Sequence, residues 1–203
     1  MKSIILTGFA LLQILFCNAQ QKAQGPIVMT AKVYSDNNEI MDLMRFENIN
    51  YFKTLFKGDS LVNKKFTITS KEFWKGKLTK TDTILNKSIF EYIGVNKADS
   101  IPLRVISSTA GKDIRIKFIF DRFETEHTFK GLKTNDYSLR DFGTALPILP
   151  NKPFYAFAYI LPYEDKEGAK YWCAVESSGK DIETWGKEFG IKHYILFEMN
   201  FFE

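Results

Sequence analysis

The segment 123–129 contains side chains whose types could support acid or base chemistry. Glu124 and Glu126 alternate along a strand-like run, so both carboxylates project from one face, as a glycoside-cleaving pair would require. His127 belongs to the opposite face, together with Phe123 and Phe129. We therefore expect the glutamates and the histidine not to form one cluster. Alternating Glu, Thr and Lys residues favour a solvated strand face instead.

The other histidine and the second cysteine lie far from this segment. His193 begins the last strand-like run, and no partner residue stands near it at a metal-ligand spacing. Cys173 lies in the apolar run Tyr171–Val175, where cysteine usually packs as a small hydrophobic residue, and a reactive or intermolecularly bridged thiol is the alternative. Spacing alone does not bring Cys173 and a histidine together as a catalytic pair. We predict no catalytic residue, no metal site and no cofactor.

Three aromatic residues give the most suggestive binding pattern. In the strand-like run Phe154–Leu161, one face holds Tyr155, Phe157 and Tyr159, and small alanines occupy the other. This stripe is either the inner face of a second layer or an exposed platform for a sugar ring or a protein partner. Buried aromatic rings are the commoner case, so the core interpretation competes with the binding interpretation.

The elements that position these side chains are mainly antiparallel strands. The 203 residues include 19 Phe, 9 Tyr and 3 Trp, which favour pleated, half-buried surfaces. Strand-like runs recur at Ile27–Tyr34, Tyr51–Phe56, Lys65–Trp74, Lys77–Leu85, Ile101–Thr109, Ile114–Phe120, Phe123–Phe129, Phe154–Leu161, Lys170–Ser177 and Ile191–Phe201. Turn signals such as Lys75–Gly76 suit hairpins between them. Apolar residues occupy even-numbered positions before Asp121–Arg122 and odd-numbered positions after it. This switch predicts either a bulge or an open turn.

Helices are few in this pattern. Apolar residues at spacings of three and four predict a helix over residues 181–189, with a capping-box-like start at Ser178 and Asp181 and an end at Gly190. A weaker helix over residues 38–46 competes with the return strand of a hairpin. Three prolines between residues 147 and 153 form a stiff connector, but the piece that follows is too short for its own core. We therefore predict one β-rich domain over residues 20–203.

Residues 1–19 have the pattern of a secretory signal peptide. A basic start precedes the apolar run Ile4–Phe16, which is followed by Ala19 at the expected cleavage site. As a helix this run would rise about 20 Å, against roughly 30 Å of hydrocarbon core, so no transmembrane span is expected. The bulky Phe16 disfavours lipid attachment at Cys17. The protein is predicted to be exported to the periplasm or beyond, without a lipid anchor.

The predicted fold class and the charge of the chain limit the functions that we consider. We predict an α+β fold, mostly antiparallel β, as a sandwich-like or curled sheet with a short helix near the C-terminus packed on one face. The net charge of +4 comes from interleaved acids and bases, so nucleic acid is not an expected partner. A noncatalytic binding or protein-interaction domain of the cell envelope is the preferred function, with a protein or carbohydrate partner. The alternatives are a small envelope hydrolase with a carboxylate or histidine site, a carbohydrate-binding module, and a small outer-membrane barrel.

Overall fold

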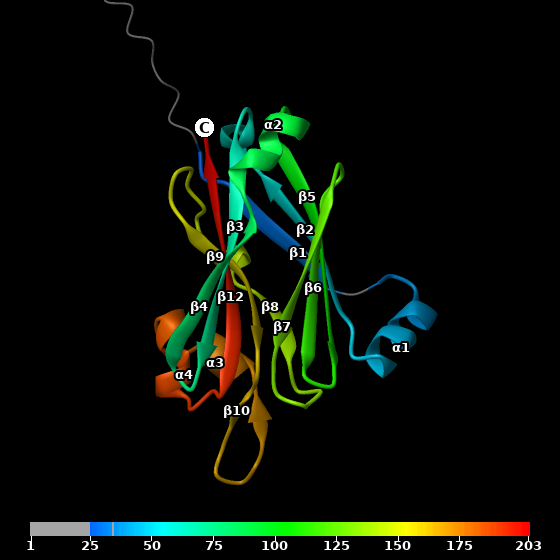
Figure 1. The fold of residues 1–203 in the computed structure, drawn as a ribbon, viewed down its shortest axis with the longest axis vertical. Helices are drawn as coiled ribbons and strands as arrows, with labels where there is room; N and C mark the ends of the chain where they lie inside the picture. The colour runs from blue at the N-terminus through cyan, green and yellow to red at the C-terminus, as the bar shows by residue number, and fades with distance from the viewer. Residues whose placement is uncertain (1–24, 34) are drawn as a thin grey trace, which may run out of the picture.

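Two five-stranded antiparallel sheets form most of the fold in the computed structural model, which describes residues 25–33 and 35–203 (Figure 1). The first sheet has the order β1 (Val28–Val33), β2 (Asn50–Lys57), β5 (Ser100–Ala110), β6 (Asp113–Ile119) and β7 (Glu124–Lys130). The second sheet has the order β4 (Lys77–Leu85), β3 (Lys65–Trp74), β12 (His193–Phe202), β9 (Phe154–Ile160) and β8 (Ser138–Asp141). A short ribbon of β10 (Tyr163–Glu164) and β11 (Lys170–Tyr171) accompanies them. The predicted antiparallel, sandwich-like α+β fold is confirmed, whereas the predicted signal peptide lies outside the described residues.

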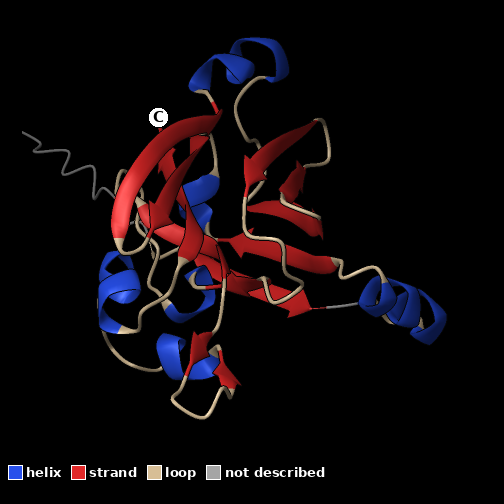
Figure 2. Cartoon of the chain, turned by 60° about the horizontal axis from the view of Figure 1, so that its bottom comes forward, coloured by secondary structure: helices blue, strands red, loops and turns tan. Residues whose placement is uncertain are grey.

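Short helices join the strands and lie at separate places around the sheets, with α1 standing out from the body (Figure 2). They are α1 (Asn38–Phe46), η1 (Asp59–Leu61), η2 (Lys87–Ile89), α2 (Phe90–Ile93), η3 (Gly143–Ala145), α3 (Cys173–Glu176), η4 (Ile182–Thr184) and α4 (Trp185–Glu188). Residues 38–46 are helical because the Asn37 side chain accepts the N–H groups of Glu39 and Ile40 and so caps the first turn. The hairpin alternative for this segment is therefore wrong.

The predicted C-terminal helix is present as η4 followed by α4. Asp181 caps it by accepting the N–H of Glu183, whereas the Ser178 hydroxyl bonds the Val175 carbonyl at the end of α3. The capping box predicted at Ser178 is therefore wrong, although the helix itself is right. Trp185 packs on Phe142 with ring centroids 5.0 Å apart, which fixes the helix against the second sheet.

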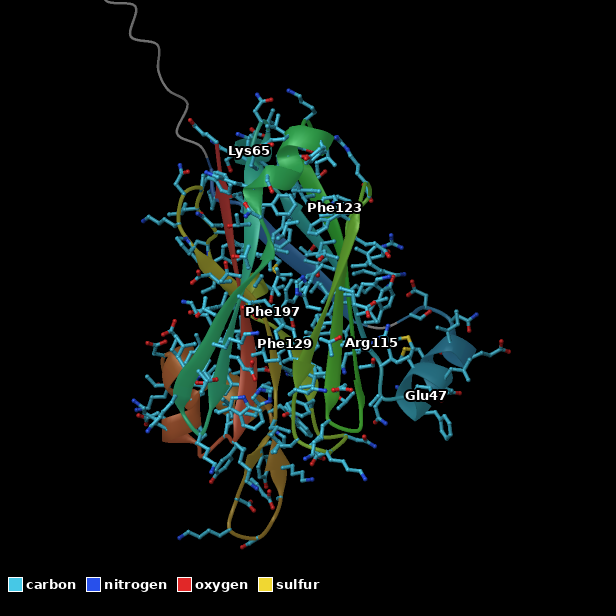
Figure 3. The ribbon with its side chains drawn as sticks, in the orientation of Figure 1. Glu47, Lys65, Arg115, Phe123, Phe129 and Phe197 are labelled. Carbon is cyan, nitrogen blue, oxygen red and sulfur yellow. The ribbon has the colours of Figure 1, made fainter. Side chains whose placement is uncertain are left out.

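Aromatic rings from both sheets interleave to form the core. Phe197 of β12 lies 5.3 Å from Phe118 of β6 and 6.1 Å from Phe129 of β7, measured between ring centroids. Figure 3 shows Phe129 and Phe197 pointing toward each other between the sheets, while Arg115 points to the outer side, where α1 stands out. Each such ring removes roughly 150–250 Å² from water, so this interface is the main source of apolar burial.

Two segments differ from the predicted strands. Between β6 and β7 the Phe120 N–H donates to the Phe123 carbonyl, so the parity switch is an open turn and not a bulge. Residues 170–177 do not form one strand, because the carbonyl of Trp172 accepts the N–H groups of Val175 and Glu176 and starts the helix α3. Short apolar runs fit helix and strand equally well. The Cys173 side chain, predicted to be buried, lies outside the described part.

The β3–β4 hairpin follows the predicted turn and ends in an irregular edge strand. Lys75 and Gly76 both have positive φ, at 50° and 74°, as a two-residue type I′ turn requires. The pairing of β4 with β3 shifts register at two places, and its exposed residues include Lys77 and Lys80. Only its last two residues, Ile84 and Leu85, are buried.

Core and surface phenylalanines should respond differently to truncation. Phe197→Ala removes a ring that is 0 % exposed and should cost about 3–5 kcal/mol of unfolding free energy, because a cavity opens between the sheets. Phe46→Ala removes a ring of α1 that is 80 % exposed and should cost less than about 0.5 kcal/mol. Urea denaturation of both variants measures the difference. Equal losses would contradict the interleaved core.

Candidate functional site

The predicted aromatic platform does not lie on one face of β9. Phe157 pairs with Phe197, but Tyr155 pairs with the next residue of β12, Glu198, so Ala156 has no partner. This bulge inserts one residue and reverses the alternation of side chains along the strand. Tyr155 therefore points to the outer face of the second sheet, away from Phe157 and Tyr159.

The other two members of the stripe are core residues. Phe157 is 0 % exposed and Tyr159 is 1 % exposed, and the Tyr159 hydroxyl lies 2.8 Å from the Thr109 hydroxyl of the opposite sheet. Phe157 contacts Phe52 and Phe118 across the sandwich. The expectation that the three rings form an exposed platform is therefore corrected. The bulge and the inward packing together remove it.

Glu124 and Glu126 lie on the solvated outer face of the first sheet, as predicted. Glu126 accepts two hydrogen bonds from the Arg115 guanidinium, at 2.9 and 2.8 Å, and Glu124 accepts one from Lys117 at 2.6 Å. His127 points to the other face, where its ring nitrogen lies 3.2 Å from the Thr125 hydroxyl. These carboxylates pair with cations of the neighbouring strand and do not converge with a histidine.

His193 belongs to a buried polar network that the sequence did not predict. Its Nδ1 lies 2.5 Å from the Tyr137 hydroxyl, and its Nε2 lies 3.2 Å from the Glu72 carboxylate. The Trp74 indole N–H donates to the same carboxylate oxygen at 2.6 Å, and its ring stacks on the imidazole. The backbone N–H of Leu132 donates to the Tyr137 hydroxyl. The network thus joins β3, β12 and the segment before β8.

The order carboxylate, imidazole, hydroxyl is that of a nucleophile with its base, but the environment opposes that use. Burial lowers the pKa of His193 to about 4, with Glu72 opposing the shift, so the ring is neutral near pH 7. Burial also raises the pKa of Tyr137 to about 12. His193 is 0 % and Tyr137 5 % exposed. The neutral imidazole donates a hydrogen bond from Nε2 to Glu72 and accepts a hydrogen bond from the Tyr137 hydroxyl at Nδ1, and these bonds stabilise the fold.

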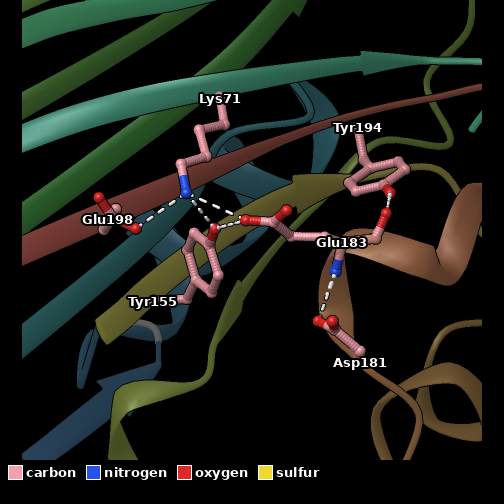
Figure 4. A network of polar contacts seen from close by, with 6 residues as sticks. All are labelled: Lys71, Tyr155, Asp181, Glu183, Tyr194 and Glu198. Atoms are coloured by element: carbon pink, nitrogen blue, oxygen red, sulfur yellow. Dashed lines mark hydrogen bonds and ion pairs between the residues drawn. The ribbon is translucent and has the colours of Figure 1, made fainter. Parts of the chain in front are cut away.

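A second polar cluster surrounds Lys71 on the outer face of the second sheet (Figure 4). The Lys71 ammonium lies 2.6 Å from the Tyr155 hydroxyl, 2.9 Å from the Glu198 carboxylate and 3.0 Å from the Glu183 carboxylate. The Tyr155 hydroxyl also donates to Glu183. The Tyr194 hydroxyl donates to the Glu183 carbonyl at 2.9 Å. These bonds attach η4 to the sheet.

Charge in this cluster is balanced internally. Burial alone would lower the pKa of Lys71, but the hydrogen bonds with Tyr155, Glu198 and Glu183 outweigh burial and raise the pKa. Burial raises the pKa of Tyr155, and hydrogen bonds from Tyr155 and Lys71 lower the pKa of Glu183. The lysine therefore stays cationic and Glu183 stays anionic near neutral pH. No sequence spacing links these residues, which come from separate segments.

An apolar hollow lies at the α2 end of the sandwich, and we call it the α2 pocket. It has a volume of about 520 Å³. Apolar side chains dominate its lining, including Leu55, Phe66, Phe90, Ile93, Ile101, Pro102, Phe120 and Phe123. Phe66 lies 5.0 Å from both Phe90 and Phe120, and the Arg122 guanidinium bonds the Ile93 carbonyl, so α2 and the β6–β7 turn are connected across the hollow.

A more polar hollow lies beside the β10–β11 ribbon. It has a volume of about 570 Å³ and contains both acids and lysines. Asp136 accepts hydrogen bonds from Lys170 and the Thr134 hydroxyl, each at 2.7 Å, and these bonds lower the pKa of Asp136. The charge of Asp136 in this hollow is therefore already paired with Lys170 of the same chain.

The helix α1 presents an apolar stripe to solvent. Ile40, Leu43 and Phe46 are 48 %, 65 % and 80 % exposed, at spacings that place them on one side of the helix. Met41 and Met44 are the buried residues of this helix. Figures 1 and 2 show α1 standing out from the body.

The described residues contain neither a metal-binding cluster nor a membrane-spanning helix. Among the described residues, no three His, Cys, Asp or Glu side chains are grouped so that they could hold a metal ion. In the same part of the chain, no helix has the length and apolar character needed to cross a membrane. No protein-family profile, curated protein or solved structure matches this chain.

The buried histidine predicts loss of stability in mild acid. The folded pKa of about 4 lies below the unfolded value of 6.5, so the unfolded chain binds more protons between these values. Stability is therefore complete above pH 6.5 and falls as the pH drops toward 4. We expect a loss of about 2 kcal/mol between about pH 7.5 and about pH 5.

Urea denaturation at both pH values tests this expectation. His193→Gln carries no titrating ring and should show a much smaller loss, whereas the control His127→Gln should keep the wild-type loss. An undiminished loss in His193→Gln would contradict the assignment.

Proposed function

We propose that this chain is a noncatalytic binding protein of the cell envelope that holds the apolar part of a small ligand in the α2 pocket. The observation that carries the proposal is the pocket itself, whose volume of about 520 Å³ falls within the size of small-molecule sites. Its lining is mainly aromatic and aliphatic, with few polar groups, as such sites usually are. The envelope location rests on the export signal predicted in residues 1–19.

The polar clusters support binding over hydrolysis. A hydrolase needs a titratable group that meets its substrate, but His193 is 0 % exposed and its polar neighbours bond one another. Lys71 is likewise held by two carboxylates. By contrast, the α2 pocket offers accessible apolar surface that gains free energy when a ligand covers it.

Filling the α2 pocket should weaken ligand binding. Ala98 is an exposed residue of the pocket lining, so Ala98→Trp adds bulk there without removing a core side chain. We expect saturable binding of the neutral, environment-sensitive dye Nile red to the wild type and binding weakened by about tenfold or more in the variant. Fluorescence titration measures both.

The matched control is Ala110→Trp, which adds the same ring at an exposed position at the far end of β5. This variant should bind the dye as the wild type does. Wild-type protein that fails to bind, or equal affinity of both variants, would refute the α2 pocket as the site.

Protein interaction through α1 is the second candidate function. The exposed stripe of Ile40, Leu43 and Phe46 is flanked by the acidic residues Glu39 and Asp42. This pattern fits a protein partner that offers an apolar groove with basic residues at its rim. The α2 pocket and α1 are separate features, so the two candidates are tested independently.

Crosslinking in cells tests the α1 candidate. A photoreactive residue at Leu43 should form a discrete adduct with one partner protein, because its side chain is 65 % exposed on the proposed contact surface. Phe46→Ser should abolish that adduct while changing stability by less than about 0.5 kcal/mol. The same photoreactive residue at Glu167, in the β10–β11 loop, serves as the control. Adducts of equal yield at both positions would argue against α1.

A further inference from the structure

The outer face of the first sheet carries a row of cations that crosses three strands. Lys32 of β1 lies directly opposite Lys53 of β2, and Lys53 lies directly opposite Arg104 of β5. All three side chains are exposed. Like charges placed opposite each other destabilise a sheet. Asp36 pairs with Lys32 and is also close enough to Lys53 for the Lys53 charge to lower its pKa, but within residues 25–33 and 35–203 no ion pair within 4.0 Å includes Lys53 or Arg104.

The next row along these strands belongs to the α2 pocket. Leu55 pairs with Pro102, and both line the pocket. They lie two residues from Lys53 and Arg104 on the same face, about 6.6 Å along the strand, within reach of a long cationic side chain. On the other side, Lys57 pairs with the pocket residue Ser100. The apolar edge of the pocket is thus bracketed by cations.

Basic residues outnumber acidic residues at the pocket. Its lining includes two basic residues, Lys97 and Arg122, and one acidic residue, Asp121. The residues that β1, β2 and β5 contribute to the three outer rows include no acid, and the row of Lys53 and Arg104 meets an acid only at Glu124 of β7, which pairs with Lys117. An anionic group placed over the Leu55–Pro102 pair would reduce the repulsion between Lys53 and Arg104. A cationic group at the same position would be repelled by Lys53 and Arg104.

We infer that the ligand of the α2 pocket is an amphipathic molecule whose apolar part enters the pocket and whose anionic group binds Lys53, Arg104 and Lys57 on the adjoining sheet face. This inference rests on the proposed function and adds the chemical class of the ligand. A carboxylate or a phosphate on an alkyl chain has this chemistry. Either a free amphiphile or a lipid headgroup could supply it.

Three probes of equal chain length separate the contributions of charge and apolar contact. Decanoate, decanol and decyltrimethylammonium are each titrated against the complex of wild-type protein with Nile red. We expect decanoate to displace the dye with about tenfold higher affinity than decanol, as two or three exposed charge contacts would give, and the cation to bind more weakly than decanol. The preference for decanoate should shrink with added salt.

Charge removal assigns the preference to this face. The double variant Lys53→Gln/Arg104→Gln should bind decanoate about tenfold more weakly and decanol unchanged, because it keeps the pocket lining. The control Lys166→Gln/Lys180→Gln removes two charges near the ribbon and α4 and should behave as the wild type. Equal wild-type affinities for decanoate and decanol, or an unchanged double variant, would overturn the anionic class.

Failure of the two proposals is distinguishable in the same experiment. If decanol displaces the dye but decanoate is not favoured, the pocket binds apolar ligands and only the anionic class is wrong. If none of the probes binds, the proposed function is wrong. Flotation with vesicles of phosphatidylglycerol or phosphatidylcholine then identifies the source: selective flotation with phosphatidylglycerol indicates a lipid headgroup, and its absence with decanoate bound indicates a free amphiphile.

Discussion

Contact between the aromatic faces of the two sheets is the interaction on which the structure depends. Phe118 and Phe129 from one sheet meet Phe157 and Phe197 from the other, at centroid distances of 5.3 to 6.4 Å. Large rings fill the interior with few side chains, so each strand must keep its apolar residues on the face that points to the other sheet. The strand β9 departs from this alternation at Ala156. The Tyr155 ring therefore points to the outer face of the second sheet, where its hydroxyl bonds Lys71 and Glu183.

The sequence predicted what depends on neighbours along the chain. Alternation of apolar residues located the strands of both sheets except β8, the short strand Ser138–Asp141, and a lysine followed by glycine marked the turn between β3 and β4. The prediction failed in β9, where the extra residue Ala156 places Tyr155 on the opposite face from Phe157. Amino-acid composition does not reveal such a bulge. The prediction also failed at residues 170–177, where a short apolar run forms a helix.

The polar clusters could not be found from spacing. His193 meets Glu72, 121 positions earlier, and Tyr137, 56 positions earlier, so only the pairing of β3 with β12 brings the network together. The α2 pocket is assembled in the same way, from β2, the loop after α2 and the β6–β7 turn. Cations on the outer faces of the sheets differ in their pairing. Lys71 of the second sheet is neutralised by carboxylates from two elements, and Arg115 and Lys117 of the first sheet pair with Glu126 and Glu124, whereas Lys53 and Arg104 lie opposite each other on β2 and β5.

The irregular strand β4 has a consequence for how copies of this protein meet. A regular, exposed edge offers free backbone groups on which another strand can align, and lysines and bulges make that alignment poor. The edge strand β4 has two register shifts and exposed lysines, so it is a poor partner for another strand. Addition of a strand from a second molecule is therefore disfavoured at this edge of the second sheet.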